Sequence, residues 1–310
     1  MALDPHIKQF IADAPEGEVD FGTFTVDQVR TAVDGWLDVA GAGAPLPEVR
    51  DLSIPGPAGP VAARLYHPDP EQALPLLVFV VGGGFVANSL EVEDTPVRQL
   101  ALLSECAVLA VRARNAPEHP YPAPILDTAA ALEWALGHAR ELGADPDTAG
   151  VGGHSSGGAL AVSALLRLPP HLVSRFSLLA LVTPSLGADF RTLSYERYAD
   201  GYPLTRTNAT WFWRQYLGDR LDTPPVDATP SVAPGVERLP AGLFSLAEYD
   251  VLHDEAALLA KRMDEAGVPV TVLPGQGLTH GFFYMDRLSP AAASANQRFA
   301  RRVGRLLRGS

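Results

Sequence analysis

Residues Gly153 to Gly157, with the sequence Gly-His-Ser-Ser-Gly, form the feature that most limits how this chain can fold. They match the pattern G-x-S-x-G, which is typical of a sharp strand-to-helix turn that exposes the hydroxyl of its central serine. The serine backbone is strained in such a turn, and side chains two residues away would collide with the neighbouring strand and helix. Because the pattern also arises by chance, its meaning depends on what surrounds Ser155.

Short apolar runs alternate with helical segments along most of the 310 residues. The runs expected to be strands are 49–54, 61–67, 76–81, 107–111, 150–151, 178–182, 241–246 and 268–273. The expected helices are 95–105, 125–142, 159–166, 254–266 and 291–307. Residues 76–81 are apolar throughout, as expected of a strand that is buried on both faces. The alternation predicts an α/β fold, in which helices cover both faces of a mostly parallel central sheet.

Two segments stand outside this alternation. Residues 1–45 are expected to form helices apart from the sheet, because Thr25 and Gln28 form a capping-box pair before apolar residues at helical spacing. Residues 189–231 are expected to form a helical insertion at the sheet edge where ligands bind. The insertion is rich in aromatic residues, which either pack against one another or line a substrate pocket: Tyr195, Tyr198, Tyr202, Trp211, Phe212, Trp213 and Tyr216.

The charge and the cysteine content argue against several classes of partner. The formal net charge of −12 is unfavourable for binding to nucleic acid or to an anionic membrane surface. Cys106 is the only cysteine, so no intramolecular disulfide can form and a reducing compartment is the simpler interpretation. No secretion signal opens the sequence, and no apolar run approaches the roughly 18 residues of a membrane span. We therefore expect a soluble, cytoplasmic protein with no nucleic-acid partner and no membrane span.

Asp250 and His280 are the partners that the sequence offers to Ser155. A serine hydroxyl is a poor nucleophile at neutral pH and needs a base within hydrogen-bond reach, which a carboxylate orients. Asp250 follows the expected strand 241–246 and His280 follows the expected strand 268–273, each after the serine in the chain. The order predicts Ser155 as nucleophile, His280 as general base and Asp250 as the orienting carboxylate. The weaker competitors are His253, Asp254 and Glu248.

The glycine run from Gly82 to Gly84 follows the expected strand 76–81 directly. Acyl transfer needs backbone N–H groups aimed at the oxyanion of the tetrahedral intermediate. We expect one from Ser156, the residue after the nucleophile, and others from this glycine loop. A phosphate-binding loop is not supported, because no lysine follows the glycines. The single cysteine and the scattered histidines show no metal-ligand spacing, so we expect no metal site and no cofactor.

Together these motifs resemble the bacterial hormone-sensitive-lipase-like (family IV) carboxylesterases of the α/β-hydrolase superfamily, over nearly the whole chain. The matching pieces are 81–85, 116–122, 153–158, 247–250 with 254–255, 280–282, and 201–205 with 211–212. The resemblance implies an α/β-hydrolase fold with a helical cap. In that organisation, residues 1–45 and 189–231 build the cap, and residues 46–188 and 232–310 build the core.

The resemblance also implies roles for individual residues. By position, Ser155 is the nucleophile, His280 the general base and acid, and Asp250 the orienting carboxylate. The oxyanion hole is implied to consist of the N–H groups of Gly83, Gly84 and Ser156. The side chains and backbone expected to line or shape the substrate pocket are Val81, Gly82, Phe85, His154, Tyr202, Trp211 and Phe282.

Three local departures from the family pattern lie near this pocket. Val81 stands where the family has the histidine of its His-Gly-Gly-Gly loop. His154 and Ser156 stand where the family has an acidic residue and an alanine. Residues 112–115 read Arg-Ala-Arg-Asn in place of Asp-Tyr-Arg-Leu. Because the expected oxyanion donors are backbone groups, the hole can form without the histidine. Because all three departures lie near one pocket, we expect a restricted or altered substrate.

The sequence therefore favours a carboxylesterase that hydrolyses short-chain or compact acyl esters through an acyl-enzyme. A second interpretation keeps the fold and the triad but assigns a non-hydrolytic step, such as cyclisation, dehydration or acyl transfer, in natural-product metabolism. A third is a non-enzymatic ligand receptor, which the presence of His280 disfavours. The expected partner is a small-molecule ester, and the sequence leaves a homodimer open.

Overall fold

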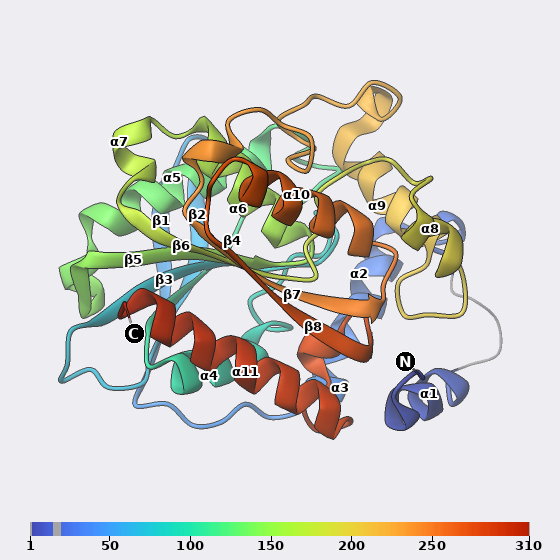
Figure 1. The fold of residues 1–310 in the computed structure, drawn as a ribbon, viewed down its shortest axis with the longest axis horizontal. Helices are drawn as coiled ribbons and strands as arrows, with labels where there is room; N and C mark the ends of the chain where they lie inside the picture. Colours follow the sequence, from blue (N-terminus) through green and yellow to red (C-terminus); the bar gives the residue numbers. More distant parts are fainter. Residues whose placement is uncertain (1, 15–19, 310) are drawn as a thin grey trace.

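The computed structural model describes residues 2–14 and 20–309 and contains one eight-stranded sheet (Figure 1). The strand order is β1-β2-β4-β3-β5-β6-β7-β8. The strands are β1 Glu48–Gly56, β2 Gly59–His67, β3 Leu74–Val80, β4 Ala107–Arg112, β5 Ala144–His154, β6 Phe176–Val182, β7 Ala241–Tyr249 and β8 Val270–Thr279. β2 pairs antiparallel with β1 and β4, and all other pairs are parallel. The predicted mostly parallel sheet is confirmed.

Helices cover both faces of the sheet (Figure 1). α4 (Asp94–Ser104) and α11 (Pro290–Leu307) pack together on one face. α5 (Ala123–Gly137), α6 (Ser156–Arg167) and α10 (His253–Glu265) lie on the other, with the short α7 (Pro170–Val173) beyond α6. Each face has its own apolar core cluster, so the sheet is buried on both sides.

β3 shows why its sequence is apolar without alternation. Leu76, Val78 and Val80 belong to the core cluster on the α5 and α6 side. Leu77 and Phe79 belong to the cluster on the α4 and α11 side. Successive side chains of a strand point to opposite faces, so a strand between two helical layers needs apolar residues at every position.

Several elements differ in extent from the prediction. β5 has 11 residues, whereas only 150–151 were expected, and the glycines hide the strand because glycine is rare in sheets. A Cβ on Gly152 would lie 2.7 Å from the oxygen of Ala180 on β6, so the close packing there requires glycine. The expected helix 125–142 ends at Gly137, and a 3₁₀ turn, η2 (Ala139–Leu142), completes the segment.

The N-terminal residues and the mid-chain insertion lie outside the sheet (Figure 1). The first segment contains α1 (Pro5–Ala12), η1 (Phe21–Thr23), α2 (Val26–Asp34) and α3 (Trp36–Ala40). The capping box at Thr25 and Gln28 is present, and Gly35 separates α2 from α3. The insertion contains α8 (Leu193–Arg197), α9 (Arg206–Leu217) and η3 (Gly218–Arg220).

Two short 3₁₀ turns complete the described elements: η4 (Val236–Arg238), before β7, and η5 (Phe282–Tyr284), after β8. Within residues 2–14 and 20–309, no helix combines the length and the apolarity that a membrane span requires.

Candidate active site

Ser155 lies on a strained turn between β5 and α6. Its φ is +52° and its ψ is −124°, in a region that residues with side chains avoid. A Cβ on Gly153 would lie 2.6 Å from the carbonyl carbon of Gly157, and one on Gly157 would lie 2.1 Å from the oxygen of Val80. The turn is held against β6, because the Ser155 N–H donates to the oxygen of Val182 at 3.0 Å. The glycines are thus required by close backbone packing, as the pattern indicated.

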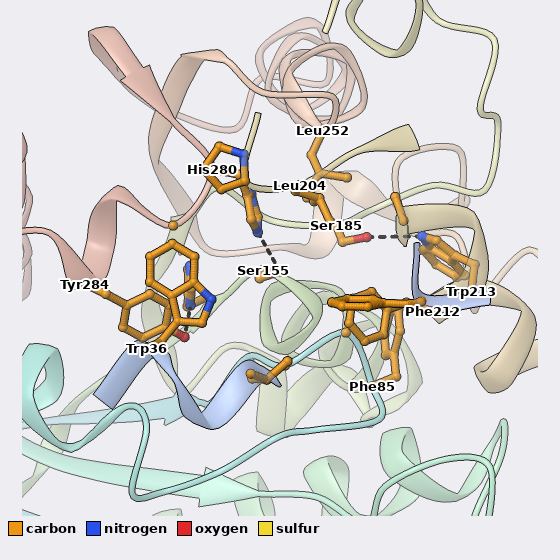
Figure 2. A pocket seen from close by; sticks show the side chains of 18 residues that line it. Trp36, Phe85, Ser155, Ser185, Leu204, Phe212, Trp213, Leu252, His280 and Tyr284 are labelled. Carbon is orange, nitrogen blue, oxygen red and sulfur yellow. Dashed lines mark hydrogen bonds between the residues drawn. The ribbon is translucent and has the colours of Figure 1, made fainter. Parts of the chain in front are cut away.

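Hydrogen-bonding distances connect Ser155, His280 and Asp250. Oγ of Ser155 lies 3.1 Å from Nε2 of His280 (Figure 2). Nδ1 of His280 lies 2.9 Å from Oδ2 of Asp250, whose side chain is fully buried. β7 and β8 end directly before Asp250 and His280, which places both residues at the same edge of the sheet as Ser155. Oδ1 of Asp250 accepts the N–H of Leu252 at 3.0 Å, so the carboxylate orientation is fixed.

The competing candidates have other contacts. Nδ1 of His253 lies 2.8 Å from a backbone oxygen of β7. Asp254 accepts the N–H of Ser194 at 2.8 Å, and Glu248 accepts the N–H of Gly277 at 2.8 Å. These contacts hold loops and helix ends, and none of the three side chains lines the cavity beside Ser155.

The glycine loop places free N–H groups beside Ser155. Gly83 has a φ of +132° and Gly84 a φ of +64°, which favour glycine. A Cβ on Gly84 would lie 2.3 Å from the ring of Phe212, so the insertion packs directly on the loop. Among the residues that the structure describes, no acceptor binds the N–H of Gly83, Gly84 or Ser156. These three N–H groups are available to a bound oxygen.

Asn88 joins two of the unusual residues, and no sequence motif pointed to it. Its N–H donates to Oδ1 of Asn115 at 3.2 Å, and Nδ2 of Asn115 donates to the Asn88 oxygen at 3.3 Å. The hydroxyl of Ser156 donates to Oδ1 of Asn88 at 3.3 Å. The departures at positions 115 and 156 therefore tie the chain after the glycine loop to the loop that follows β4 and to α6.

Glu93 is a second buried residue that the sequence reasoning missed. Its side chain is about 1% exposed, and Oε1 lies 2.8 Å from Nδ1 of His154 and 3.1 Å from the N–H of Gly82. An isolated acid beside the start of a helix is typical of a solvated residue near the positive end of the helix dipole. No motif or spacing could have distinguished Glu93 from such a residue.

A narrow cavity of about 100 Å³ lies beside Ser155. Figure 2 shows His280 and Leu252 on one side of the serine, Trp36 and Tyr284 on another, and Phe212, Trp213 and Phe85 opposite them. The indole N–H of Trp213 donates to Oγ of Ser185 at 3.1 Å, which fixes both side chains in the wall. The lining residues are Phe21, Val33, Trp36, Gly83, Gly84, Phe85, His154, Ser155, Ser185, Pro203, Leu204, Ala209, Phe212, Trp213, Leu252, His280, Gly281 and Tyr284.

Of the residues expected to line or shape the pocket, Phe85 and His154 line the cavity and the others do not. Val81 and Phe282 are fully buried in the core cluster on the α4 and α11 side. Gly82 begins the loop, and a Cβ there would be 2.8 Å from the oxygen of His154. These positions adjoin a motif in the sequence, but neighbouring residues in a strand or turn point in different directions.

The two aromatic choices in the insertion also lie away from the cavity. The ring of Tyr202 packs against Tyr198 and Tyr249, with centroids 5.5 and 5.6 Å apart. The ring of Trp211 packs against Phe21 at 5.9 Å, and the next residue, Phe212, faces the cavity instead. The sequence located the aromatic surface but not the rotation of α9 about its axis.

The arrangement can carry out nucleophilic acyl transfer. It offers a hydroxyl, an imidazole within hydrogen-bond distance, a buried carboxylate behind the imidazole, and free N–H donors beside the hydroxyl. Within the described ranges, no group of three or more His, Cys, Asp or Glu side chains could hold a metal ion.

Comparisons with known proteins show the family to which the chain belongs. The family model described as alpha/beta hydrolase fold matches residues 77–284. The esterase LipI of Mycobacterium tuberculosis is 38% identical over 263 residues, which cover 81% of each chain. An arylesterase of Saccharolobus solfataricus is 30% identical over 292 residues, which cover 93% of this chain and 95% of the other.

A solved structure gives the same result. The hyperthermophilic esterase from the archaeon Pyrobaculum calidifontis superposes with a TM-score of 0.90, at 31% identity and 98% coverage of both chains. The match includes the sheet and the segments outside it, because it covers nearly all of both chains. The chain therefore belongs to the α/β-hydrolase fold family, in its hormone-sensitive-lipase-like branch of esterases.

Proposed function

We propose that this protein is a serine carboxylesterase that hydrolyses short-chain or compact acyl esters through an acyl-enzyme on Ser155. The observation that carries the proposal is the line of Ser155, His280 and Asp250 beside three free backbone N–H groups. The reaction class is that of the named relatives, which include an esterase and an arylesterase.

The proposed reaction uses each group of the site in turn. Nε2 of His280 takes the hydroxyl proton as Oγ of Ser155 attacks the ester carbonyl carbon. The resulting oxyanion accepts hydrogen bonds from the N–H groups of Gly83, Gly84 and Ser156, each contributing on the order of 10²–10³ in rate. His280 returns the proton to the leaving alcohol. It then deprotonates the water that attacks the acyl group, and it returns that proton to Oγ of Ser155 as the acid leaves, while Asp250 holds the imidazole in orientation.

The dimensions of the cavity support a compact substrate. Its volume of about 100 Å³ lies well below the roughly 300–1,000 Å³ of pockets that hold drug-sized ligands. Phe212 and Trp213 close the side formed by the insertion, and the bond from Trp213 to Ser185 restricts their movement. The apolar walls oppose a charged acyl group, and the small volume leaves room for a short acyl chain only.

We further propose that residues 1–45 and 189–231 act together as the cap of the site, over a core of residues 46–188 and 232–310. Contacts between the two segments support this division. The N–H of Phe21 donates to Oδ1 of Asn208 at 3.0 Å, and its ring meets that of Phe212 edge-on at 5.4 Å. Phe21, Val33 and Phe212 all face the cavity, so both segments contribute to its wall.

The test is hydrolysis of p-nitrophenyl esters of increasing acyl length. We expect turnover of the acetate and butyrate, falling kcat/KM for longer chains, and loss of activity by at least about 10⁴-fold in Ser155→Ala. Ser174→Ala, an exposed serine on the surface, is the matched control and should behave as the parent protein. Full turnover in Ser155→Ala would exclude the proposal. Labelling of Ser155 by a fluorophosphonate without turnover of any ester would favour the non-hydrolytic alternative instead.

A further inference from the structure

Glu93 is the centre of a buried polar cluster behind the glycine loop. The cluster consists of Glu93 beside the start of α4, Gly82 at the start of the loop, His154 at the end of β5, and Tyr284 in η5. The side chains of Glu93 and His154 are about 1 and 2% exposed, and Tyr284 is buried. Three of these segments adjoin Ser155, His280 or the oxyanion donors, so the cluster joins the parts of the proposed site from behind.

One oxygen of Glu93 holds the cluster together. Oε1 accepts the N–H of Gly82 at 3.1 Å and the hydroxyl of Tyr284 at 2.8 Å, and it lies 2.8 Å from Nδ1 of His154. Burial, with the Glu93 carboxyl beside it, raises the pKa of Tyr284, so the phenol keeps its proton and remains a donor. A carboxylate oxygen only accepts, so Nδ1 of His154 carries the hydrogen of its contact.

The bond to Gly82 places this cluster in contact with the oxyanion loop. Gly82 directly precedes Gly83, the first of the free N–H donors, and Val81 before it has an apolar side chain buried in the core. There is no room at Gly82 for a side chain, because a Cβ would lie 3.0 Å from Nδ1 of His154 and 3.2 Å from Oε1 of Glu93. The Glu93 carboxylate is therefore the side chain that fixes the start of the loop.

His154 extends the same cluster to the nucleophile and the base. It directly precedes Ser155, and its ring lies nearly parallel to that of His280, with centroids 5.9 Å apart and an interplanar angle of 18°. Glu93 thus contacts, through one residue each, the strand end that carries Ser155 and the loop that carries the N–H donors.

We propose that Glu93 and His154 form a complementary acid–base pair that positions the oxyanion loop for the ester hydrolysis proposed above. They are positioning residues, because neither supplies the attacking oxygen or the proton that moves. Val81 has an apolar side chain that cannot anchor the loop by a hydrogen bond, so the contact of Glu93 with Gly82 and His154 provides that anchoring here. Its role rests on the proposed function, because it acts through the donors at Gly83 and Gly84.

The first test separates the hydrogen bonds from the charge. Glu93→Leu keeps the volume of the side chain but removes the acceptor. We expect kcat per active site to fall about 10²-fold, because a loop displaced by about 1 Å misplaces the N–H donors. KM should change by less than about threefold. Glu93→Gln keeps an oxygen for Gly82 and should stay within about tenfold of the parent protein. The matched control is Glu91→Leu, which removes an exposed acid two residues earlier and should behave as the parent protein. Titration of Ser155 with a fluorophosphonate counts the folded sites in each variant.

The second test asks whether the two positions depend on each other. We expect Glu93→His and His154→Glu each to lose about 10²-fold or more in kcat, because each buries two groups of the same kind. The double variant Glu93→His with His154→Glu restores an acid beside a base and should recover to within about tenfold of the parent protein. This comparison remains decisive if Glu93→Leu does not fold.

A transition-state analogue distinguishes positioning of the hole from general support of the fold. A trifluoromethyl ketone adds to the serine and places its oxyanion in the hole, so its inhibition constant should rise by the same factor as kcat falls. Unchanged ketone affinity in variants with lowered kcat would overturn the proposal. The proposal would also be overturned if the double variant regained thermal stability without regaining kcat. An unchanged kcat in both Glu93→His and His154→Glu would overturn it as well. Absence of ester turnover in the parent protein would instead reject the proposed function itself.

Discussion

At the scale of single residues, Val81 is informative because it departs from the family pattern and yet lies outside the cavity. Its side chain is fully buried in the apolar cluster with Leu77 and Phe79, on the face of the sheet covered by α4 and α11. The proposed oxyanion donors are backbone N–H groups, and Glu93 already accepts the N–H of Gly82. The chemistry of the side chain at position 81 should therefore matter more for stability than for the rate.

We predict that Val81→His lowers stability by about 1–3 kcal/mol, because an imidazole is buried without a partner. The rate with p-nitrophenyl acetate per titrated Ser155 should change by no more than about 10²-fold, because the N–H donors remain. Thermal unfolding and active-site titration measure the two effects separately. Val81→Thr, which keeps the shape and replaces one methyl group with a hydroxyl, is the control. A larger loss of rate in fully titrated protein would contradict this account.

Residue identity alone located some residues of the candidate site and concealed others. Ser155, His280 and Asp250 could be proposed from the sequence because each stands in a motif and their order along the chain is characteristic. Glu93 and Asn88 could not, because only the fold shows that they are buried beside the glycine loop. An acid near a helix start and an amide in a loop are ordinary surface features until the fold encloses them.

At the scale of elements, Glu255 connects α10 to the chain that leaves β6 towards the insertion. Oε1 of Glu255 accepts the N–H of Leu186 at 2.6 Å, and Oε2 has no partner among the residues that the structure describes. Burial raises the pKa of Glu255 well above its usual 4.5, and the nearby carboxyls of Asp250 and Asp189 raise it further. The hydroxyl of Tyr195 lies in the same buried region.

We predict that this buried acid makes stability fall as the pH rises. A raised pKa means that the folded state holds the proton more tightly than the unfolded state does. The stabilisation is complete below about pH 4.5, where the carboxyl is protonated in both states, and it is lost as the pH rises through the folded-state pKa. Glu255→Gln cannot ionise, so its Tm relative to the parent protein should increase with pH.

Thermal unfolding from about pH 4.5 to about pH 8 tests this difference. Glu265→Gln, an exposed acid at the end of the same helix, should show a constant difference from the parent protein over that range. Parallel Tm curves for Glu255→Gln and the parent protein would mean that the pKa of Glu255 is the same in the folded and unfolded states, which would contradict the prediction.

The boundaries of an element could be predicted where the apolar pattern of its sequence determines them. They were missed where contacts with other elements determine them. The run 76–81 identified β3 because both faces of that strand need apolar side chains. β5 was mostly hidden, since its glycines are explained only by the close approach of β6 and of the ring of Phe79. The insertion was recognised as aromatic and helical, but the side of α9 that faces the cavity depends on how the helix packs.

At the scale of the whole molecule, the sheet edge brings together residues that are far apart in sequence. Ser155, Asp250 and His280 each follow a parallel strand, so the topology alone places them at one edge. The segments outside the sheet then reduce the access to that edge to a narrow cavity. The fold class followed from the strand and helix alternation, whereas the shape of the cavity depends on packing between the N-terminal segment and the insertion.

The central claim is that Ser155 forms a covalent acyl intermediate, and intact-protein and peptide mass spectrometry test it most directly. After rapid acid quench of the enzyme with p-nitrophenyl butyrate, we predict one butyryl group per chain, located on the peptide that contains Ser155. The signal should be absent in Ser155→Ala and should decay as the substrate is consumed. Steady hydrolysis with no acyl group on any peptide, or an acyl group on a different residue, would contradict the account.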